Sequence, residues 1–152
     1  MRAIVEKVKN CTLYSEGKLF SHIDGGFLVL FGVHETDTME MVPHFAQKIV
    51  KLRVFRDQND KMNFNIQNTG GEIMLVSNFT LYGRTKGANR PDFTHSAKPE
   101  LAEKIYNALI KELQKYVPTK TGVFRTHMDI EMTADGPGTF LIEEYSTSDA
   151  VY

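Results

Sequence analysis

The 152-residue chain has one cysteine, Cys11, so an internal disulfide is excluded and a reducing compartment is expected. Its formal net charge is −1, so any binding of nucleic acid must rest on a local basic patch. The longest apolar run, from Phe27 to Val33, is far shorter than the ~20 residues that a membrane-spanning helix needs. The N-terminus also lacks the layout of a signal peptide. These features predict a cytoplasmic globular protein with no membrane partner.

The chain also lacks the residue patterns by which many hydrolases and metal sites are recognised. It has no Gly-x-Ser-x-Gly motif, no Cys-His arrangement and no glycine-rich phosphate loop. Its five histidines are scattered without the spacing of metal ligands, so neither a metal nor another cofactor is expected. A search of the residues for a catalytic triad therefore fails.

What the chain does contain is the pattern of one α+β domain, expected over residues 1–145 with a polar tail at 146–152. The hydrophobic content of 41% is typical of a globular protein. The predicted helices span residues 39–51, capped by Thr36 or Asp37, and 99–116. The predicted strands span residues 1–8, 11–14, 19–23, 27–33, 53–56, 72–81, 123–124, 128–133 and 139–145. The strands 11–14 and 19–23 are expected to form a hairpin around Glu16-Gly17. Residues 63–69 are expected to be irregular, and Ile4 and Val8 to share a strand face with Glu6.

The segment 72–81 is the one best suited to carry chemistry. An apolar run after Gly70-Gly71 predicts a buried central strand. The run turns polar at Ser77 and Asn78 while strand spacing is expected to continue to Leu81. Polar groups at the end of a rigid strand can hold a reacting group, but they can equally satisfy local backbone. The residues alone leave both interpretations open.

A second segment, Asp135-Gly136-Pro137-Gly138-Thr139, lies between two predicted strands, and by itself it is consistent with an ordinary hairpin turn. Ser-Asn-Phe-Thr-Leu at 77–81 followed by this segment resembles the D-aminoacyl-tRNA deacylase family, whose patterns read Ser-Gln-Phe-Thr-Leu and Asn-Asp-Gly-Pro-Val-Thr. Further matches lie at 1–5, 26–33, 52–55, 61–63, 90–93 and 120–124. The resemblance covers about residues 1–144.

The resemblance implies a homodimer that hydrolyses D-aminoacyl-tRNA, and also glycyl-tRNA, as chirality proofreading in translation. It implies a curled antiparallel-rich sheet, a β-barrel or roll, with two main helices packed on one side. The implied catalytic segment is Ser77, Asn78, Phe79 and Thr80, where main-chain amides near Phe79 and Thr80 bind the ester carbonyl and the terminal 2′-hydroxyl of the tRNA assists water. The implied substrate-binding residues are Gly136, Pro137, Met128, Arg90 and Lys86.

In the family, the Gly-Pro motif adopts a cis peptide bond and enters the pocket of the partner subunit. There its carbonyl groups exclude an L side chain by a steric clash, so glycine is also admitted. The long connection 82–98 carries Arg84, Lys86, Arg90 and Lys98. We expect these cations to hold the tRNA acceptor end, although a solvated basic loop is an equal alternative.

The chain departs from the family pattern at several motif positions. Gly138 replaces a bulky residue, Asn78 replaces Gln, Arg125-Thr126 replaces Gly-Ala, and Ala88-Asn89 differs before Arg-Pro. Gly138 is expected to loosen the Gly-Pro segment, with Asp135 and Thr139 bonding across the turn and the cis bond retained. Two alternatives remain: a deacylase that is less strict about chirality, and a nucleic-acid-binding paralogue that has lost turnover.

Overall fold

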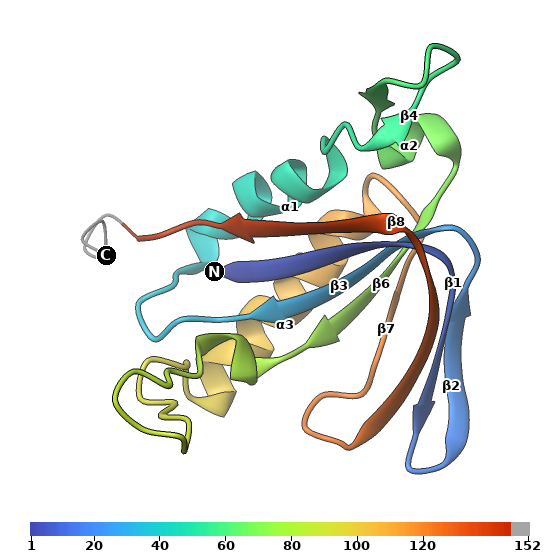
Figure 1. Ribbon diagram of the computed structural model, residues 1–152. Coiled ribbons are helices and arrows are strands. Elements are labelled where there is room, and N and C mark those ends of the chain that lie inside the picture. Colours follow the sequence, from blue (N-terminus) through green and yellow to red (C-terminus); the bar gives the residue numbers. More distant parts are fainter. Residues whose placement is uncertain (147–152) are drawn as a thin grey trace.

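One curled sheet organises the structure, a computed structural model that describes residues 1–146 (Figure 1). Its strands are β1 (Arg2–Ser15), β2 (Lys18–Ile23), β3 (Gly26–Gly32), β6 (Glu72–Ser77), β7 (Thr119–Thr121) and β8 (Met128–Glu143). Their order is β2-β1-β3-β6-β7, and β8 pairs with β1. Because β1 pairs with three strands, it is the central element of the sheet.

The sheet combines two kinds of pairing. β1 is antiparallel to β2, β3 and β8, whereas β3–β6 and β6–β7 are parallel. Parallel neighbours require crossover connections, and these contain α1 (Val42–Val50) and α3 (Pro99–Gln114). Both helices contribute to one buried cluster with the sheet and lie on one face of it (Figure 1). The predicted α+β fold with two main helices on one side is therefore confirmed.

β1 is longer than expected, since the predicted strands 1–8 and 11–14 form one strand. The hairpin that follows turns at Glu16 and Gly17, as expected. The shared face predicted for Ile4 and Val8 is wrong. Val8 is buried in a second apolar cluster together with Cys11 and Leu13, whereas Ile4 is only half-buried. Burial raises the pKa of the Cys11 thiol to about 11, which leaves it inert as a nucleophile.

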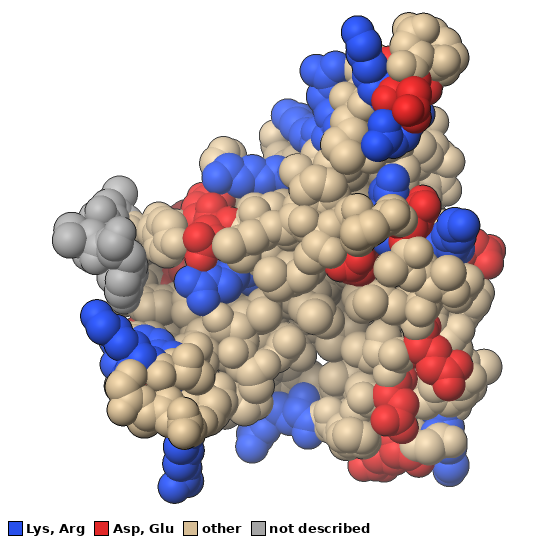
Figure 2. All heavy atoms as spheres, viewed as in Figure 1, with Lys and Arg blue, Asp and Glu red and all other residues tan. Residues whose placement is uncertain are grey.

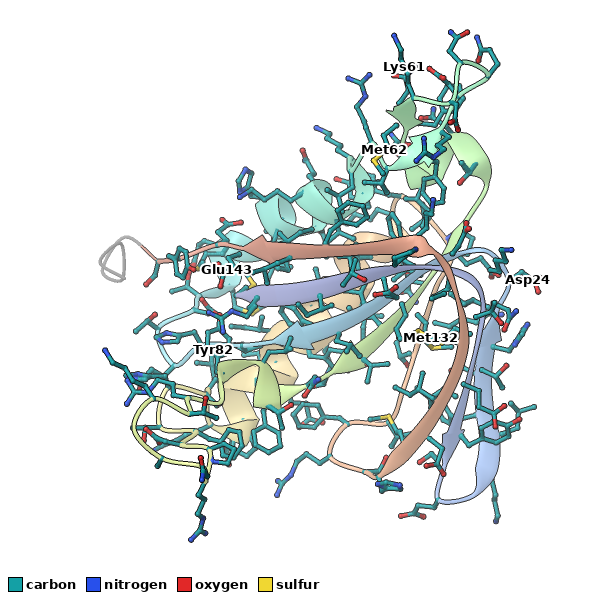
Figure 3. The ribbon with its side chains drawn as sticks, in the orientation of Figure 1. Asp24, Lys61, Met62, Tyr82, Met132 and Glu143 are labelled. Atoms are coloured by element: carbon teal, nitrogen blue, oxygen red, sulfur yellow. The ribbon has the colours of Figure 1, made fainter. Side chains whose placement is uncertain are left out.

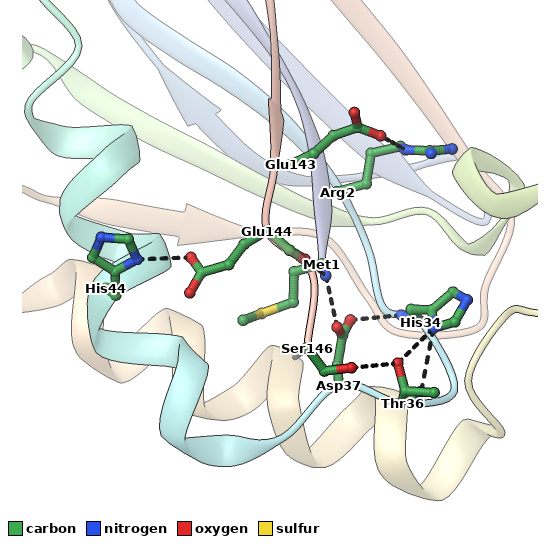
Figure 4. A network of polar contacts seen from close by, with 9 residues as sticks. All are labelled: Met1, Arg2, His34, Thr36, Asp37, His44, Glu143, Glu144 and Ser146. Atoms are coloured by element: carbon green, nitrogen blue, oxygen red, sulfur yellow. Dashed lines mark hydrogen bonds and ion pairs between the residues drawn. The ribbon is translucent and has the colours of Figure 1, made fainter. Parts of the chain in front are cut away.

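The first helix begins later than its apolar pattern suggests. A 3₁₀ turn, η1 (Met39–Met41), precedes α1, and Pro43 lies in the first turn of α1, where its missing N–H is tolerated. Neither Thr36 nor Asp37 caps this helix. Asp37 is instead buried in a polar network with the chain terminus (Figure 4).

That network joins three segments that are distant in sequence. The Met1 ammonium donates to Asp37 Oδ1 at 2.7 Å and to the carbonyl of Glu144 at 2.6 Å. The second oxygen of Asp37 accepts the main-chain N–H of His34 at 2.7 Å. The Asp37 carboxylate therefore links the N-terminus to the segment after β3, and the Met1 ammonium joins both to the segment after β8.

Residues 53–69 form a projecting arm with more structure than expected. β4 (Phe55–Arg56) and β5 (Met62–Phe64) make a separate two-stranded sheet, followed by α2 (Ile66–Thr69). The Asn65 side chain caps α2 in a reciprocal capping box with Asn68, so the prediction of irregular structure there is wrong. Lys61 and Met62 project from the arm (Figure 3). Figure 2 shows Lys and Arg side chains gathered on the same arm.

Two other predictions near the C-terminus are also wrong. Residues 123–124 are not a strand, and the last parallel strand is β7 at 119–121. The strands predicted at 128–133 and 139–145 form the single strand β8. Of the predicted tail, residues 147–152 lie outside the described part of the chain. Among residues 1–146, no helix is both long and apolar enough to cross a membrane.

Candidate active site

The candidate active site is built where β6 ends. Asn78 has φ −143° and ψ 90° and is the N-cap of a 3₁₀ turn, η2 (Phe79–Tyr82). Its side-chain oxygen accepts the N–H of Thr80 at 3.2 Å and also the Thr80 hydroxyl. The predicted continuation of the strand to Leu81 is therefore wrong, because an asparagine that caps its own following turn diverts the chain.

The turn holds a main-chain donor without an acceptor in the described residues. The N–H of Thr80 is occupied by Asn78, whereas the N–H of Phe79 has no acceptor among residues 1–146. The Phe79 ring is 57% exposed and lies edge-on to Phe93, with 5.0 Å between ring centroids. The Ser96 hydroxyl donates to the Phe79 carbonyl at 3.1 Å, which ties the turn to the segment before α3. Phe79 is thus held by its neighbours while its N–H stays available.

A pocket of about 600 Å³ opens beside this turn. Its lining comes from the end of β6, η2, the start of α3 and the segment before β8; the residues are Ser77, Asn78, Phe79, Phe93, Ser96, Ala97, Pro99, Ala102, Phe124, Arg125, Thr126 and Met128. The structure therefore brings four predicted site residues together: Ser77, Asn78, Phe79 and Met128. Thr80, Lys86, Arg90, Gly136 and Pro137 are not part of the lining.

The Gly136-Pro137 segment is a bulge within β8 and not a hairpin turn. Glu6 of β1 pairs with Thr139 and Val8 pairs with Ala134, so four β8 residues, 135–138, lie opposite Lys7 alone. The Gly136–Pro137 peptide bond is cis, as expected. None of the bulge residues 135–138 lines the pocket beside η2.

Side chains of β1 fix this bulge. The Lys7 ammonium lies 3.8 Å from the Asp135 carboxylate and 5.7 Å from the centroid of the Phe55 ring. The Thr139 hydroxyl donates to the carboxylate of Glu6. The predicted hydrogen bonding of Asp135 and Thr139 across a turn is therefore replaced by contacts with the neighbouring strand.

Comparison with known proteins places this arrangement in a family. The model of the D-Tyr-tRNA(Tyr) deacylase family matches residues 4–143. The chain belongs to this family. A protein of Thermosipho africanus named D-aminoacyl-tRNA deacylase is 40% identical over 144 residues, which cover 94% of this chain and 97% of that protein. A protein of the same name from Clostridioides difficile is 41% identical over 144 residues, 94% of this chain and 97% of that protein.

Two solved structures are similar to this deacylase-family chain. One, titled "c-Myc DNA Unwinding Element Binding Protein", has a TM-score of 0.90 and 34% identity, and the match covers 96% of this chain and all of that one. The other, titled as a probable eukaryotic D-amino acid tRNA deacylase, has a TM-score of 0.78 and covers 93% of this chain and 98% of that one. At 14% identity the second likeness supports the fold alone.

The basic loop of this family member is only partly free to bind a ligand. Arg84 forms an ion pair with Asp92 at 3.0 Å and donates to His95 Nε2 at 2.9 Å. The pKa of Asp92 is lowered, chiefly by the hydrogen bond from the Thr94 hydroxyl. Lys86 and Arg90 are exposed and form no ion pair within residues 1–146. Figure 2 shows cationic side chains over this loop at the lower left.

One cluster of potential metal-ligating side chains was not predicted from the sequence. Ligand-type atoms of His34, Glu35 and His95 lie within 4.8 Å of one another, although His95 is 60 residues from Glu35. Both nitrogens of His95 are engaged, Nδ1 with Glu35 at 2.8 Å and Nε2 with Arg84. A guanidinium beside a ligand nitrogen opposes a metal cation, and the hydrogen bonds of this cluster join the segment after β3 to the loop 82–98. No local spacing in the sequence signals it.

Proposed function

We propose that this chain hydrolyses the ester bond of D-aminoacyl-tRNA and releases a free D-amino acid and tRNA. The observation that carries the proposal is the available N–H of Phe79 at the wall of a pocket that also contains Ser77 and Met128. Relatives that are 40–41% identical over nearly their whole length bear the name of this activity, which supports it further.

In the proposed mechanism, the N–H of Phe79 binds the ester carbonyl oxygen. Water adds to the carbonyl carbon, and negative charge develops on that oxygen as the tetrahedral intermediate forms. A donor placed in this way typically stabilises the transition state by about 2.7–4 kcal/mol. Collapse of the intermediate breaks the bond to the 3′-oxygen of the tRNA, which takes a proton. The neighbouring 2′-hydroxyl assists the attacking water.

Thr80 is not the nucleophile in this mechanism. Its hydroxyl donates to the side-chain amide oxygen of Asn78, and an amide oxygen is not a base that can activate it. We expect Thr80→Ala to keep kcat within about tenfold of the parent enzyme. The measurement is single-turnover hydrolysis of D-Tyr-tRNA, with circular dichroism as the check on folding. Complete loss of turnover in a folded variant would restore Thr80 as the nucleophile.

We further propose that the protein is a homodimer in which the cis Gly136-Pro137 segment excludes L residues from the partner's pocket and admits glycine. None of the bulge residues 135–138 lines the pocket of its own chain, which supports action in trans. β8 pairs only with β1 among the described residues and exposes Met132 and Leu141 by 45% and 58%. Long edge strands with apolar side chains favour association. Sedimentation velocity that showed only monomer at micromolar concentration would contradict the dimer.

Gly138→Val should sharpen chiral selection. Gly138 is not in the left-handed region, so valine can adopt its backbone conformation. An added Cβ would lie 3.3 Å from Lys7 Cβ and 3.3 Å from the Asp135 carbonyl oxygen, tight contacts that require the bulge to shift by a few tenths of an ångström and then restrict its movement. The loss of glycine freedom, ~0.5–1 kcal/mol, predicts a roughly two- to fivefold higher ratio of D- to L-aminoacyl-tRNA hydrolysis rates. Ala134→Val on the same strand is the control, and an unchanged ratio in the Gly138 variant would refute the argument.

The exposed cations of the loop are proposed to contact the tRNA acceptor end. Changing Lys86 and Arg90 to Gln should reduce the slope of log affinity against log salt by about 1–2. The matched control changes Lys104 and Lys111, which are exposed on α3, to Gln. Fluorescence anisotropy with deacylated tRNA measures both slopes. Equal slopes for the two double variants would place the tRNA elsewhere.

The proposed activity itself is tested by incubating the protein with matched D-, L- and glycyl-tRNA and measuring release of the amino acid. Hydrolysis of the D and glycyl substrates, with L slower, is the expected result for a cytoplasmic proofreading enzyme. The alternative is nucleic-acid binding without turnover; a neighbour that is 34% identical is titled as a DNA unwinding element binding protein. Binding of tRNA with no release of any amino acid would favour that alternative.

A further inference from the structure

Arg125 adopts a backbone conformation that favours glycine. The N–H of Thr126 donates to the carbonyl of Val123 at 3.4 Å, which closes a four-residue turn, and Arg125 is its third residue with φ 61°. A positive φ at this position of a turn is usually supplied by glycine, and the family pattern has glycine here. A non-glycine residue kept in this region against its backbone preference is a reason to look for function.

The rest of the turn holds this conformation in place. The Thr126 hydroxyl group bonds the Val123 carbonyl at 3.1 Å and the Ser15 hydroxyl at 3.2 Å. The Phe124 ring stacks on Tyr106 of α3, with 5.9 Å between centroids. Both neighbours of Arg125 are therefore anchored to the body of the protein, and the direction in which the arginine leaves the backbone is fixed.

The pocket gives this arginine a distinctive electrostatic setting. Among residues 1–146, Arg125 is the one charged residue in the lining, and no lining residue there carries a carboxylate. The side chain is exposed and forms no ion pair or hydrogen bond within residues 1–146. A guanidinium whose donors are all free, at the edge of a pocket without acidic groups, attracts a negatively charged oxygen group.

We infer that Arg125 binds an anionic oxygen group of the substrate at the edge of the pocket that contains the Phe79 N–H. The inference rests on the proposed function and names a specificity-determining residue for it. Two parts of a D-aminoacyl-tRNA can supply such a group. One is the phosphate that precedes the terminal adenosine, and the other is the side-chain carboxylate of a D-aspartyl or D-glutamyl ester.

The test compares Arg125→Asn with the parent enzyme. Asparagine tolerates positive φ, so the variant removes the charge while keeping the turn. Loss of a charged hydrogen bond predicts a kcat/KM that is about ten- to hundredfold lower for substrates with the anionic group. If the phosphate is bound, D-tyrosyl- and D-aspartyl-tRNA are affected equally and D-tyrosyl-adenosine is not. If the carboxylate is bound, only the D-aspartyl substrates are affected. Unchanged kcat/KM on every substrate overturns the inference.

A second measurement separates function from backbone strain. Arg125→Gly relieves the unfavourable φ, so its Tm should rise by about 2–4 °C while anion binding is lost. The control for the loss of one positive charge is Lys111→Asn, on the exposed face of α3. Glycine is not used at this position because glycine within a helix is itself destabilising. It should leave kcat/KM unchanged.

The two proposals can fail separately. If the parent hydrolyses D-tyrosyl-tRNA but the Arg125 variants match it on all substrates, only the role of Arg125 is wrong. If the parent hydrolyses nothing, the proposed function fails. Anisotropy with a single-stranded RNA ending in CCA, and with amide-linked D-aspartyl-adenosine, then decides whether Arg125 binds either anion.

Discussion

Replacing Phe79 with proline should lower kcat on D-aminoacyl-tRNA by about 100- to 1000-fold, which is the typical effect of removing one oxyanion donor. Side-chain substitutions cannot remove a main-chain N–H, but proline has none. If the Phe79 N–H binds the developing oxyanion, its deletion affects the transition state far more than the bound ester. The loss should therefore fall on kcat, with KM little changed.

The local backbone accommodates this substitution. Phe79 is the first residue of η2, a position where proline is tolerated because its N–H has no partner in the turn. Asn78 is extended, with φ −143° and ψ 90°, and so lies outside the α region that a following proline disfavours. Phe79→Ala is the matched control, because it removes the same ring and keeps the N–H. If both variants have the same kcat in steady-state assays, which also give KM, the N–H is not the oxyanion donor.

Replacing Asp37 with alanine should lower the free energy of unfolding by roughly 3–5 kcal/mol, as when one partner of a buried ion pair is removed. Asp37 is 4% exposed and its two oxygens accept the Met1 ammonium and the His34 N–H, each at 2.7 Å. Burial lowers the pKa of the Met1 ammonium, and the bond to Asp37 opposes that effect. Without Asp37, both donors are left without their carboxylate in a buried site.

Urea denaturation followed by circular dichroism measures this effect. Asp24→Ala is the control, because Asp24 has a side chain that is 91% exposed and only a surface contact with His22. Its effect should stay within about 1 kcal/mol. Asp37→Asn keeps an acceptor for the His34 N–H and should fall between the two. Equal midpoints for the alanine variants of Asp37 and Asp24 would show that the network contributes nothing to stability.

Sequence periodicity predicted the elements whose stability is local. The two strands on either side of Glu16-Gly17, the apolar β3 and the helix α3 were all predicted from short-range patterns. Periodicity failed to predict the bounds of an element where a single capping side chain ends or starts that element. Asn78 ends β6 by capping the next turn, and Asn65 starts α2 in a segment that looked irregular. Capping of this kind depends on φ and ψ, which the apolar pattern does not contain.

The candidate site was predictable to a smaller extent. The residues alone did not decide whether Ser77 and Asn78 hold a reacting group or satisfy local backbone. Only the family resemblance pointed to Phe79, Met128 and the cis Gly136–Pro137 bond. Spacing could not show that Met128 lies beside Phe79, because β7 and the turn before β8 bring them together. Nor could it show His95 beside Glu35, since that contact depends on how the loop 82–98 folds back onto the end of β3.

The bulge in β8 also determines where the sequence of this protein can tolerate mutations during evolution. The four residues opposite Lys7 are accommodated outside the ladder, and β1 resumes its pairing with β8 on both sides of them. Insertions or substitutions there leave the hydrogen-bonded register of β6 and the Asn78 cap untouched. Mutations can therefore change the bulge, which is proposed to discriminate between substrates, independently of η2, which is proposed to carry the chemistry. If both proposals hold, mutations in the bulge would alter chiral discrimination while the enzyme stays active.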